Sequence, residues 1–246
     1  MLKVWLKGFE MKDISVYFSV DDVAVLKDWS SHIASVQSNG YLEGYRPLDK
    51  RFGFITNMVF RHLDKSKMCQ IKQEYRAILT RAKDIGKSRL MSSYCMGAYF
   101  IALNRNTTLS PEECYALYKD GLSANQLFHK VMGNADSYLD AKKLPARKKW
   151  SADSHKRKYE NDWVVDILEG GANDNFELGY DYHTCGICSL CRDEGCFELA
   201  KYLCRMDYVL ADMMHMRLVR TQTIAEGAAC CDFRYSRIES EPKKNP

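Results

Sequence analysis

The stretch that decides the fold is residues 180–235, YDYHTCGICSLCRDEGCFELAKYLCRMDYVLADMMHMRLVRTQTIAEGAACCDFRY. It contains seven of the ten cysteines of the 246-residue chain. Its hydrophobic pattern predicts a helix, a strand, a tight turn and a second strand. We therefore expect the chemistry of the protein to be concentrated here, with the preceding chain acting mainly as scaffold.

The predicted helix begins at about Asp193 or Cys196. Its core-facing side is an apolar stripe made by Leu203, Met206, Leu210 and Met213. Beside that stripe, Cys204 and Asp207 are three residues apart and therefore neighbours on one helical face, with small alanines above and below them. Two interpretations stand side by side: a functional thiol–carboxylate pair, or a carboxylate that only accepts a hydrogen bond from an arginine or a backbone group.

A β-hairpin is predicted to follow this helix, with strands Met216–Thr223 and Ala229–Tyr235. Gly227 can adopt the positive φ angle that the tight connection needs. A loop centred on residues 226 and 227 sets Arg220 opposite Phe233 and residue 222 opposite 231. Arg220 then lies in the middle of the apolar face of the hairpin.

A guanidinium on an apolar face requires an anion, because an unpaired buried charge is too costly. Arg220 is therefore expected to pair with Asp207 or with the carboxylate of a ligand. This inference depends on the register, since a slip of one residue would turn Arg220 to the other face.

Another cysteine group follows the spacing C-x2-C-x2-C-x4-C, at Cys185, Cys188, Cys191 and Cys196. Thiolates at such spacing can wrap an iron–sulfur cluster or bind zinc, although the pattern matches neither motif fully. The simpler interpretation is neutral thiols in a tightly packed turn. His183 is either a base for Cys185 or a histidine that faces solvent.

The rest of the chain predicts a helical first part and a sheet in the second. In the N-terminal 60 residues, Val16–Val20 alternates like a strand and Val23–Ile33 has helical spacing. Residues 90–103 form an apolar helix, and Ser110 and Pro111 begin another. Residues 163–182 alternate around a Gly-Gly turn and predict an antiparallel hairpin. We expect one α+β domain over residues 1–246, with a mainly helical scaffold (1–158) packed on an antiparallel sheet in the site-bearing region (159–238).

Composition fits an ordinary soluble protein, with 46% hydrophobic residues and a formal net charge of +4. No run of about 18 apolar residues predicts a membrane span. The N-terminal residues lack the pattern of a secretory signal, so we expect a cytoplasmic protein with reduced thiols. The basic residues 142–158 predict a solvated connector rather than a nucleic-acid-binding patch.

In these residues the chain resembles the L-2-amino-thiazoline-4-carboxylic acid hydrolase family. The matching pieces, in order, are YDYHTCGI, ELAKYLCRMDYVLA, LVRTQTIAEG and CDFRY. The family pattern falls on Cys185, Cys204, Asp207, Arg220, Thr221, Thr223, Gly227, Cys231, Asp232 and Phe233. Cys188, Cys191 and Cys196 stand outside that pattern and keep the metal-binding alternative open.

The resemblance implies a hydrolase of cysteine metabolism that acts on carbon–nitrogen (amidine-like) bonds and opens a cyclic isothiourea carboxylic acid to an N-carbamoyl amino acid. Cys204, Asp207 and Cys185 would be catalytic, with Cys204 as the nucleophile and Asp207 as the amidinium anchor or proton shuttle. The small-molecule carboxylate would be bound by Arg220, Thr221, Thr223, Asp232 and His183. No cofactor is expected, and homo-oligomerisation is left open. The alternative is a non-catalytic sensor module that binds a small molecule, a metal or an iron–sulfur cluster in the same cysteine-rich pocket.

Overall fold

The structure is a computed structural model that describes residues 65–124, 129–130 and 132–238. The strand and the helix expected within the first 60 residues lie outside these ranges. Among the described residues, no helix is long and apolar enough to cross a bilayer.

Seven α-helices and four strands are described, with three short 3-10 helices between them. The helices are α5 (Lys65–Arg81), α6 (Met91–Asn106), α7 (Pro111–Ala124), α9 (Ala135–Tyr138), α10 (Leu144–Ser154), α11 (Gly186–Asp193) and α12 (Ala200–Met213). The strands are β1 (Val164–Glu169), β2 (Leu178–Thr184), β3 (Met216–Val219) and β4 (Cys231–Arg237). The 3-10 helices are η1 (Ala141–Lys143), η2 (Phe197–Leu199) and η3 (Ile224–Glu226).

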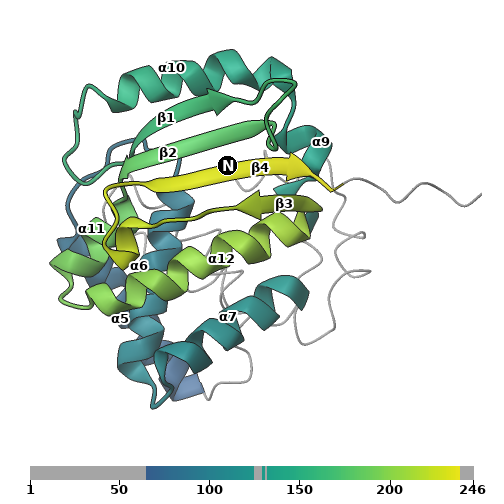
Figure 1. Cartoon of the computed structure of the whole chain (residues 1–246). Coiled ribbons are helices and arrows are strands. Elements are labelled where there is room, and N and C mark those ends of the chain that lie inside the picture. Colours follow the sequence, from purple (N-terminus) through teal and green to yellow (C-terminus); the bar gives the residue numbers. More distant parts are fainter. Residues whose placement is uncertain (1–64, 125–128, 131, 239–246) are drawn as a thin grey trace, which may run out of the picture.

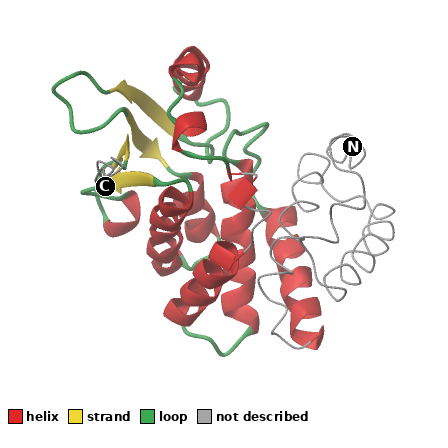
Figure 2. Cartoon of the chain, turned by 90° about the vertical axis from the view of Figure 1, so that its right-hand side faces the viewer, coloured by secondary structure: helices red, strands yellow, loops and turns green. Residues whose placement is uncertain are grey.

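The strands form one antiparallel sheet in the order β1-β2-β4-β3. The described helices lie on one side of it, and none of them covers the other face, as the two views show (Figure 1, Figure 2). This arrangement follows from the strand alternation, because inward-facing residues such as Tyr180, Phe233 and Tyr235 are buried. The predicted α+β class is therefore confirmed.

Helix α6 is the centre of the helical layer. Eleven of its residues are buried, as the apolar run in the sequence predicts. Helix α7 begins at Pro111, as predicted, where the backbone N–H of Glu113 donates to Ser110 Oγ and the Glu113 carboxylate accepts from Ser110. These helices form the packed support for α11 and α12, which carry the cysteines.

The predicted hairpin of β3 and β4 has the expected register, with Leu218 opposite Tyr235 and Val219 opposite Arg234. Its first strand is shorter than predicted and ends at Val219. The reason is that Asp232 Oδ1 accepts hydrogen bonds from the backbone N–H groups of residues 221 and 222, in place of a regular ladder. Gly227 has a φ of 94°, as the turn requires.

Two other segments differ from the sequence-based expectation. The basic segment predicted to be a connector contains α10, whose Trp150 packs against Tyr180 and Tyr182 with ring centroids 6.4 and 6.5 Å apart. The cysteine turn after β2 is instead the helix α11, which packs against α6 through buried Cys188 and Leu190. Both helices form because each buries an apolar side against the rest of the protein, although the residue pattern of each predicts a helix only weakly.

Gly186 permits the entry into α11, because the chain there passes close to Trp163. A Cβ atom at residue 186 would lie 2.6 Å from the Trp163 ring, and that ring is 4% exposed and enclosed by the core. Gly186→Ala should therefore lower the free energy of unfolding by about 1–3 kcal/mol. Urea denaturation followed by circular dichroism measures this loss.

Gly97 in α6 provides the matched control. A Cβ atom there would meet its nearest neighbour, Leu190, at 3.6 Å, which is ordinary contact. Gly97→Ala should leave stability unchanged or increase it by up to about 1 kcal/mol, because alanine favours the helix. Equal effects of the two substitutions would contradict the assignment of a close approach at Gly186.

Candidate active site

The site is organised by an ion pair between α12 and the chain that leaves β3. Arg220 Nη1 donates to Asp207 Oδ2 at 2.9 Å, and Nη2 donates to the carbonyl oxygen of Cys204 at 3.1 Å. The Arg220 side chain is 5% exposed and that of Asp207 is 34% exposed. The pairing of Arg220 with Asp207 that the sequence predicts is thus present.

Aromatic rings enclose the Arg220 guanidinium on two sides. Its Cζ atom lies 4.9 Å from the ring centroid of Phe233 and 5.0 Å from that of Tyr208. These contacts fix the plane of the guanidinium and favour its charge. Arg220 is therefore a positioned group with its orientation set before any ligand arrives.

Burial and the ion pair shift the pKa values of both partners. Burial raises the pKa of Asp207 to about 6, although the Arg220 charge acts in the opposite direction. Burial alone would lower the pKa of Arg220, but the Asp207 carboxylate outweighs it and the pKa is raised. Asp207 can consequently gain or lose a proton close to neutral pH.

Replacing the Arg220 guanidinium with an uncharged side chain should show how burial and the ion pair together set the pKa of Asp207. In Arg220→Met, burial of Asp207 acts unopposed, and its pKa should rise above about 6. A carboxyl group whose pKa is raised in the folded state stabilises the protein at pH values below its unfolded-state pKa of about 4. This stabilisation is lost as the pH rises through the folded-state pKa. Because this loss extends to higher pH in the variant, wild type should become increasingly more stable than Arg220→Met as the pH rises above 6.

Urea denaturation of both proteins at about pH 5 and about pH 8 tests this expectation. Asp207→Asn/Arg220→Met is the control, because it lacks the titrating carboxyl and should show a smaller pH-dependent difference from wild type than Arg220→Met does. A difference between wild type and Arg220→Met that is the same at both pH values would contradict the role of Arg220.

A group of three thiols lies near this pair. Cys185 follows β2 as the N-cap residue of α11, Cys188 lies in the first turn of that helix, and Cys204 comes from α12. The Cys188 thiol interacts with the thiols of both Cys185 and Cys204. Cys188 and Cys204 are buried, whereas Cys185 is partly exposed.

The thiols of Cys185 and Cys188 differ in acidity. The pKa of Cys185 is lowered, first by the hydrogen bond from the Cys188 thiol and then by the backbone amides of Cys188 and Ile187, against the effect of burial. Those amides do not form a full capping hydrogen bond with the sulfur, but their dipoles favour a thiolate at a helix N-terminus. The pKa of Cys188 is raised, because its proton is held between two sulfurs and the thiol is buried.

Alkylation rates should report this difference. The rate for Cys185 should stay high to a lower pH than that for the exposed Cys69, and Cys188→Ala should raise the pKa of Cys185 because it removes the S–H donor. Iodoacetamide labelling over a pH series, read by peptide mass spectrometry, gives both rates. Cys230→Ala is the control that should leave the Cys185 profile unchanged. Identical profiles for Cys185 and Cys69 would contradict the assignment.

The four cysteines considered as metal ligands are divided between two groups. The backbone N–H of Cys196 donates to the carbonyl oxygen of Cys191 at 2.8 Å, whereas Cys185 and Cys188 belong to the group near Cys204. Within the described residues, no set of three or more His, Cys, Asp or Glu side chains has an arrangement that could hold a metal ion. The four therefore do not form one ligand set in this structure.

Thr221, Thr223 and Asp232 are bound to one another or to the turn. Thr221 Oγ1 donates to Asp232 Oδ2 at 2.6 Å. Thr223 caps η3 and donates to Glu226 Oε2 at 2.7 Å. These contacts stabilise the segment that follows Arg220.

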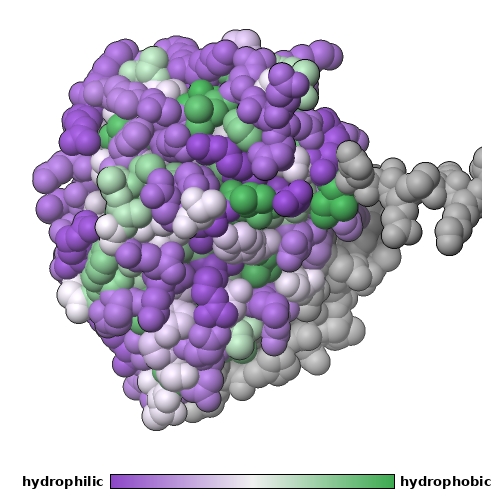
Figure 3. Space-filling view, viewed as in Figure 1, coloured by the Kyte–Doolittle hydropathy of each residue, from purple (hydrophilic) through white to green (hydrophobic). Residues whose placement is uncertain are grey.

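His183 lies on the open face of the sheet. Its Nε2 is 2.8 Å from Asp166 Oδ2, and Asp166 Oδ1 is 2.7 Å from His155 Nε2. This face is largely hydrophilic in the space-filling view (Figure 3). Of the two interpretations of His183, the structure supports the solvent-facing one and places its ring on the side of the sheet away from Asp207.

Sequence reasoning did not single out the tyrosines beside the site or the role of Cys188. Tyr235 is buried and Tyr182 is half-buried near Asp207, and desolvation keeps their pKa values well above the usual range. Cys231 accepts a hydrogen bond from the backbone N–H of Ile224 at 3.1 Å, and burial raises the pKa of Cys231 to about 12. In the sequence, the alternation of residues along the strands predicts that these tyrosines face inward. The C-x2-C spacing directly after a strand is the pattern that indicates a role for Cys188.

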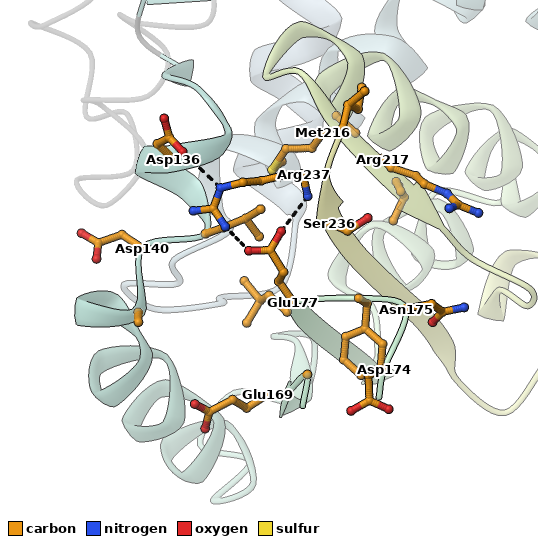
Figure 4. A pocket seen from close by; sticks show the side chains of 18 of the residues that line it. Asp136, Asp140, Glu169, Asp174, Asn175, Glu177, Met216, Arg217, Ser236 and Arg237 are labelled. Atoms are coloured by element: carbon orange, nitrogen blue, oxygen red, sulfur yellow. Dashed lines mark hydrogen bonds and ion pairs between the residues drawn. The ribbon is translucent and has the colours of Figure 1, made fainter. Parts of the chain in front are cut away.

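The large hollow of the described region lies at the other end of the sheet. It measures about 1210 Å³ and is bordered by the β1–β2 turn, the end of β4 and the α9 region. In Figure 4, Arg237 extends between Asp136 and Glu177, with which it forms ion pairs. None of the predicted site residues lines this hollow, so it is separate from the thiol group.

Fold and site together define an α+β protein that gathers thiols, a carboxyl group and a guanidinium at one end of an antiparallel sheet. The model of the family L-2-amino-thiazoline-4-carboxylic acid hydrolase matches residues 88–235, which is more than half of the chain. The chain belongs to this family. Comparisons with curated proteins and with solved structures give no match.

Proposed function

We propose that the protein hydrolyses a small cyclic amidine or isothiourea carboxylic acid, with 2-amino-thiazoline-4-carboxylate as the model substrate. The observation that supports this most is the convergence of a thiol of lowered pKa, a carboxyl group and a guanidinium at one site, in a chain of this family. These are the groups that an electrophilic amidine carbon, its basic nitrogens and a carboxylate would require.

In the proposed reaction, the Cys185 thiolate attacks the amidine carbon, and the bond from that carbon to the ring sulfur breaks. The ring opens to a thiol, and the amidine carbon remains bound to Cys185. Water then adds to this carbon and the Cys185 thiolate leaves, which gives the N-carbamoyl amino acid. The sum is one substrate plus one water, with no net oxidation or reduction.

The preference for Cys185 over Cys204 as nucleophile follows from access and acidity. Cys185 is partly exposed and has a lowered pKa, whereas Cys204 is 8% exposed and contacts the Cys188 thiol. A nucleophile must reach the substrate as a thiolate, which Cys185 does more readily. Cys204 then serves to hold Cys188 and, through its carbonyl oxygen, Arg220.

Asp207 and Arg220 are proposed to bind the two ends of the substrate. With a pKa of about 6, Asp207 can hold a protonated amidine as a carboxylate and can return a proton to the leaving sulfur. Arg220 uses two of its amino groups on Asp207 and Cys204. Guanidinium N–H groups beyond those two contacts can bind the substrate carboxylate.

Cysteine substitutions test the reaction directly. Cys185→Ser should lower kcat by at least about 100-fold, because the serine hydroxyl is a far weaker nucleophile at neutral pH. Cys204→Ser should retain activity within about tenfold, since it keeps the carbonyl contact to Arg220. Chromatographic measurement of the N-carbamoyl product, after removal of protein, gives these rates.

Cys230→Ser is the matched control, because that cysteine neighbours Cys231 but lies outside the proposed machinery. Rates should be measured with and without a chelator, and metal content should be determined. Loss of activity in Cys204→Ser with full activity in Cys185→Ser would reverse the assignment of the nucleophile. Stoichiometric metal and absence of hydrolysis would favour the sensor function instead.

A further inference from the structure

We propose that Cys185 and Cys188 form a thiol–disulfide exchange site, in which Cys185 attacks a low-molecular-weight disulfide and Cys188 resolves the mixed disulfide. This activity goes beyond the proposed hydrolysis and needs neither the amidine substrate nor Arg220. It uses the same partly exposed cysteine, so oxidation of the pair would also block Cys185 as a nucleophile.

The placement of the two cysteines carries the proposal. Cys185 is the N-cap residue of the eight-residue helix α11, and Cys188 lies in its first turn. The two thiols interact closely enough for each to shift the pKa of the other, as expected for an N-cap residue and the third residue of the helix, which adjoin in the first turn. A disulfide brings the two Cβ atoms to about 3.5–4.5 Å from each other, so the backbone at the N-terminal end of α11 adjusts together with the two side chains as the bond forms.

The two thiols also have the asymmetry that exchange requires. Cys185 is partly exposed and Cys188 is buried, so an incoming disulfide meets Cys185 first. The pKa of Cys185 is lowered and that of Cys188 is raised, which makes Cys185 the attacking thiolate and keeps Cys188 as a thiol until the first step is complete.

The reaction balances in two steps. The Cys185 thiolate attacks one sulfur of the disulfide, forms a mixed disulfide and releases one thiolate. The Cys188 thiol passes its proton to that thiolate and attacks Cys185, which releases the second thiolate. The protein loses two electrons as the Cys185–Cys188 disulfide forms, and the small disulfide gains two as it becomes two thiols.

A second dithiol in the chain gives an internal comparison. Cys191 and Cys196 are also neighbours, because the backbone N–H of Cys196 donates to the carbonyl oxygen of Cys191 at 2.8 Å, but both are buried. A small disulfide should therefore react at Cys185 before it reaches that pair. Cys69 is exposed, and within the described residues its sulfur contacts Gln73 rather than another thiol, so it should form only an unresolved adduct.

The experiment treats the reduced full-length protein with oxidised glutathione, quenches with iodoacetamide and maps tryptic peptides by mass spectrometry. Residues 159–192 form one peptide that contains Cys185, Cys188 and Cys191, while cleavage after Arg192 separates Cys196. In the Cys69→Ser protein, in which Cys185 and Cys188 are unchanged, these two cysteines should be lost as free thiols without forming a glutathione adduct. Cys191 should be alkylated.

Variants separate the two steps. Cys188→Ser should accumulate a stable glutathione adduct on Cys185, and Cys185→Ser should form neither the adduct nor the disulfide. If a variant does not fold, the peptide map of the protein that retains both Cys185 and Cys188 is sufficient to test the proposal. Unmodified Cys185, a disulfide that joins Cys204 or Cys196, or an unresolved adduct in wild type would overturn the proposal. Because no amidine substrate is used, failure of hydrolysis and failure of exchange are observed separately.

Discussion

A guanidinium placed under an apolar sheet face must be neutralised, because its desolvation costs several kcal/mol. Arg220, with a side chain that is 5% exposed, meets this requirement through Asp207 on α12 and the carbonyl oxygen of Cys204 one turn earlier. The constraint fixes α12 against the end of β3. It also places Cys204 beside the first turn of α11, where it contacts Cys188.

This pairing was predictable from the sequence, because period-two alternation and a Gly227 turn determine the hairpin register, and an arginine on the apolar face requires an anion. The end of β3 at Val219 was not predictable. There the Asp232 side chain takes the hydrogen bonds that a strand partner would otherwise accept. A side chain that replaces a backbone partner leaves no signal in hydrophobic periodicity.

The thiol group was only partly predictable for a similar reason. The spacing of Cys185, Cys188, Cys191 and Cys196 is compatible with metal ligands and with helical neighbours, and eight residues carry too little periodicity to decide. Packing against α6 decides for the helix α11. Once the helix exists, Cys185 lies at its N-terminus while Cys191 belongs to a separate thiol pair. The difference between the cysteines therefore comes from tertiary structure.

The charges of the site also bear on which ligand it would accept. Ionised Asp207 disfavours the Cys185 thiolate, whereas Arg220 favours the Asp207 carboxylate. With all three groups ionised, their net charge is −1, because two anions face one cation. A ligand with an amidinium group would relieve the repulsion between the thiolate and the carboxylate, and a carboxylate on the same ligand would complement Arg220. This charge arrangement supports the proposed substrate class independently of the family match, since it follows from the positions of Cys185, Asp207 and Arg220 alone.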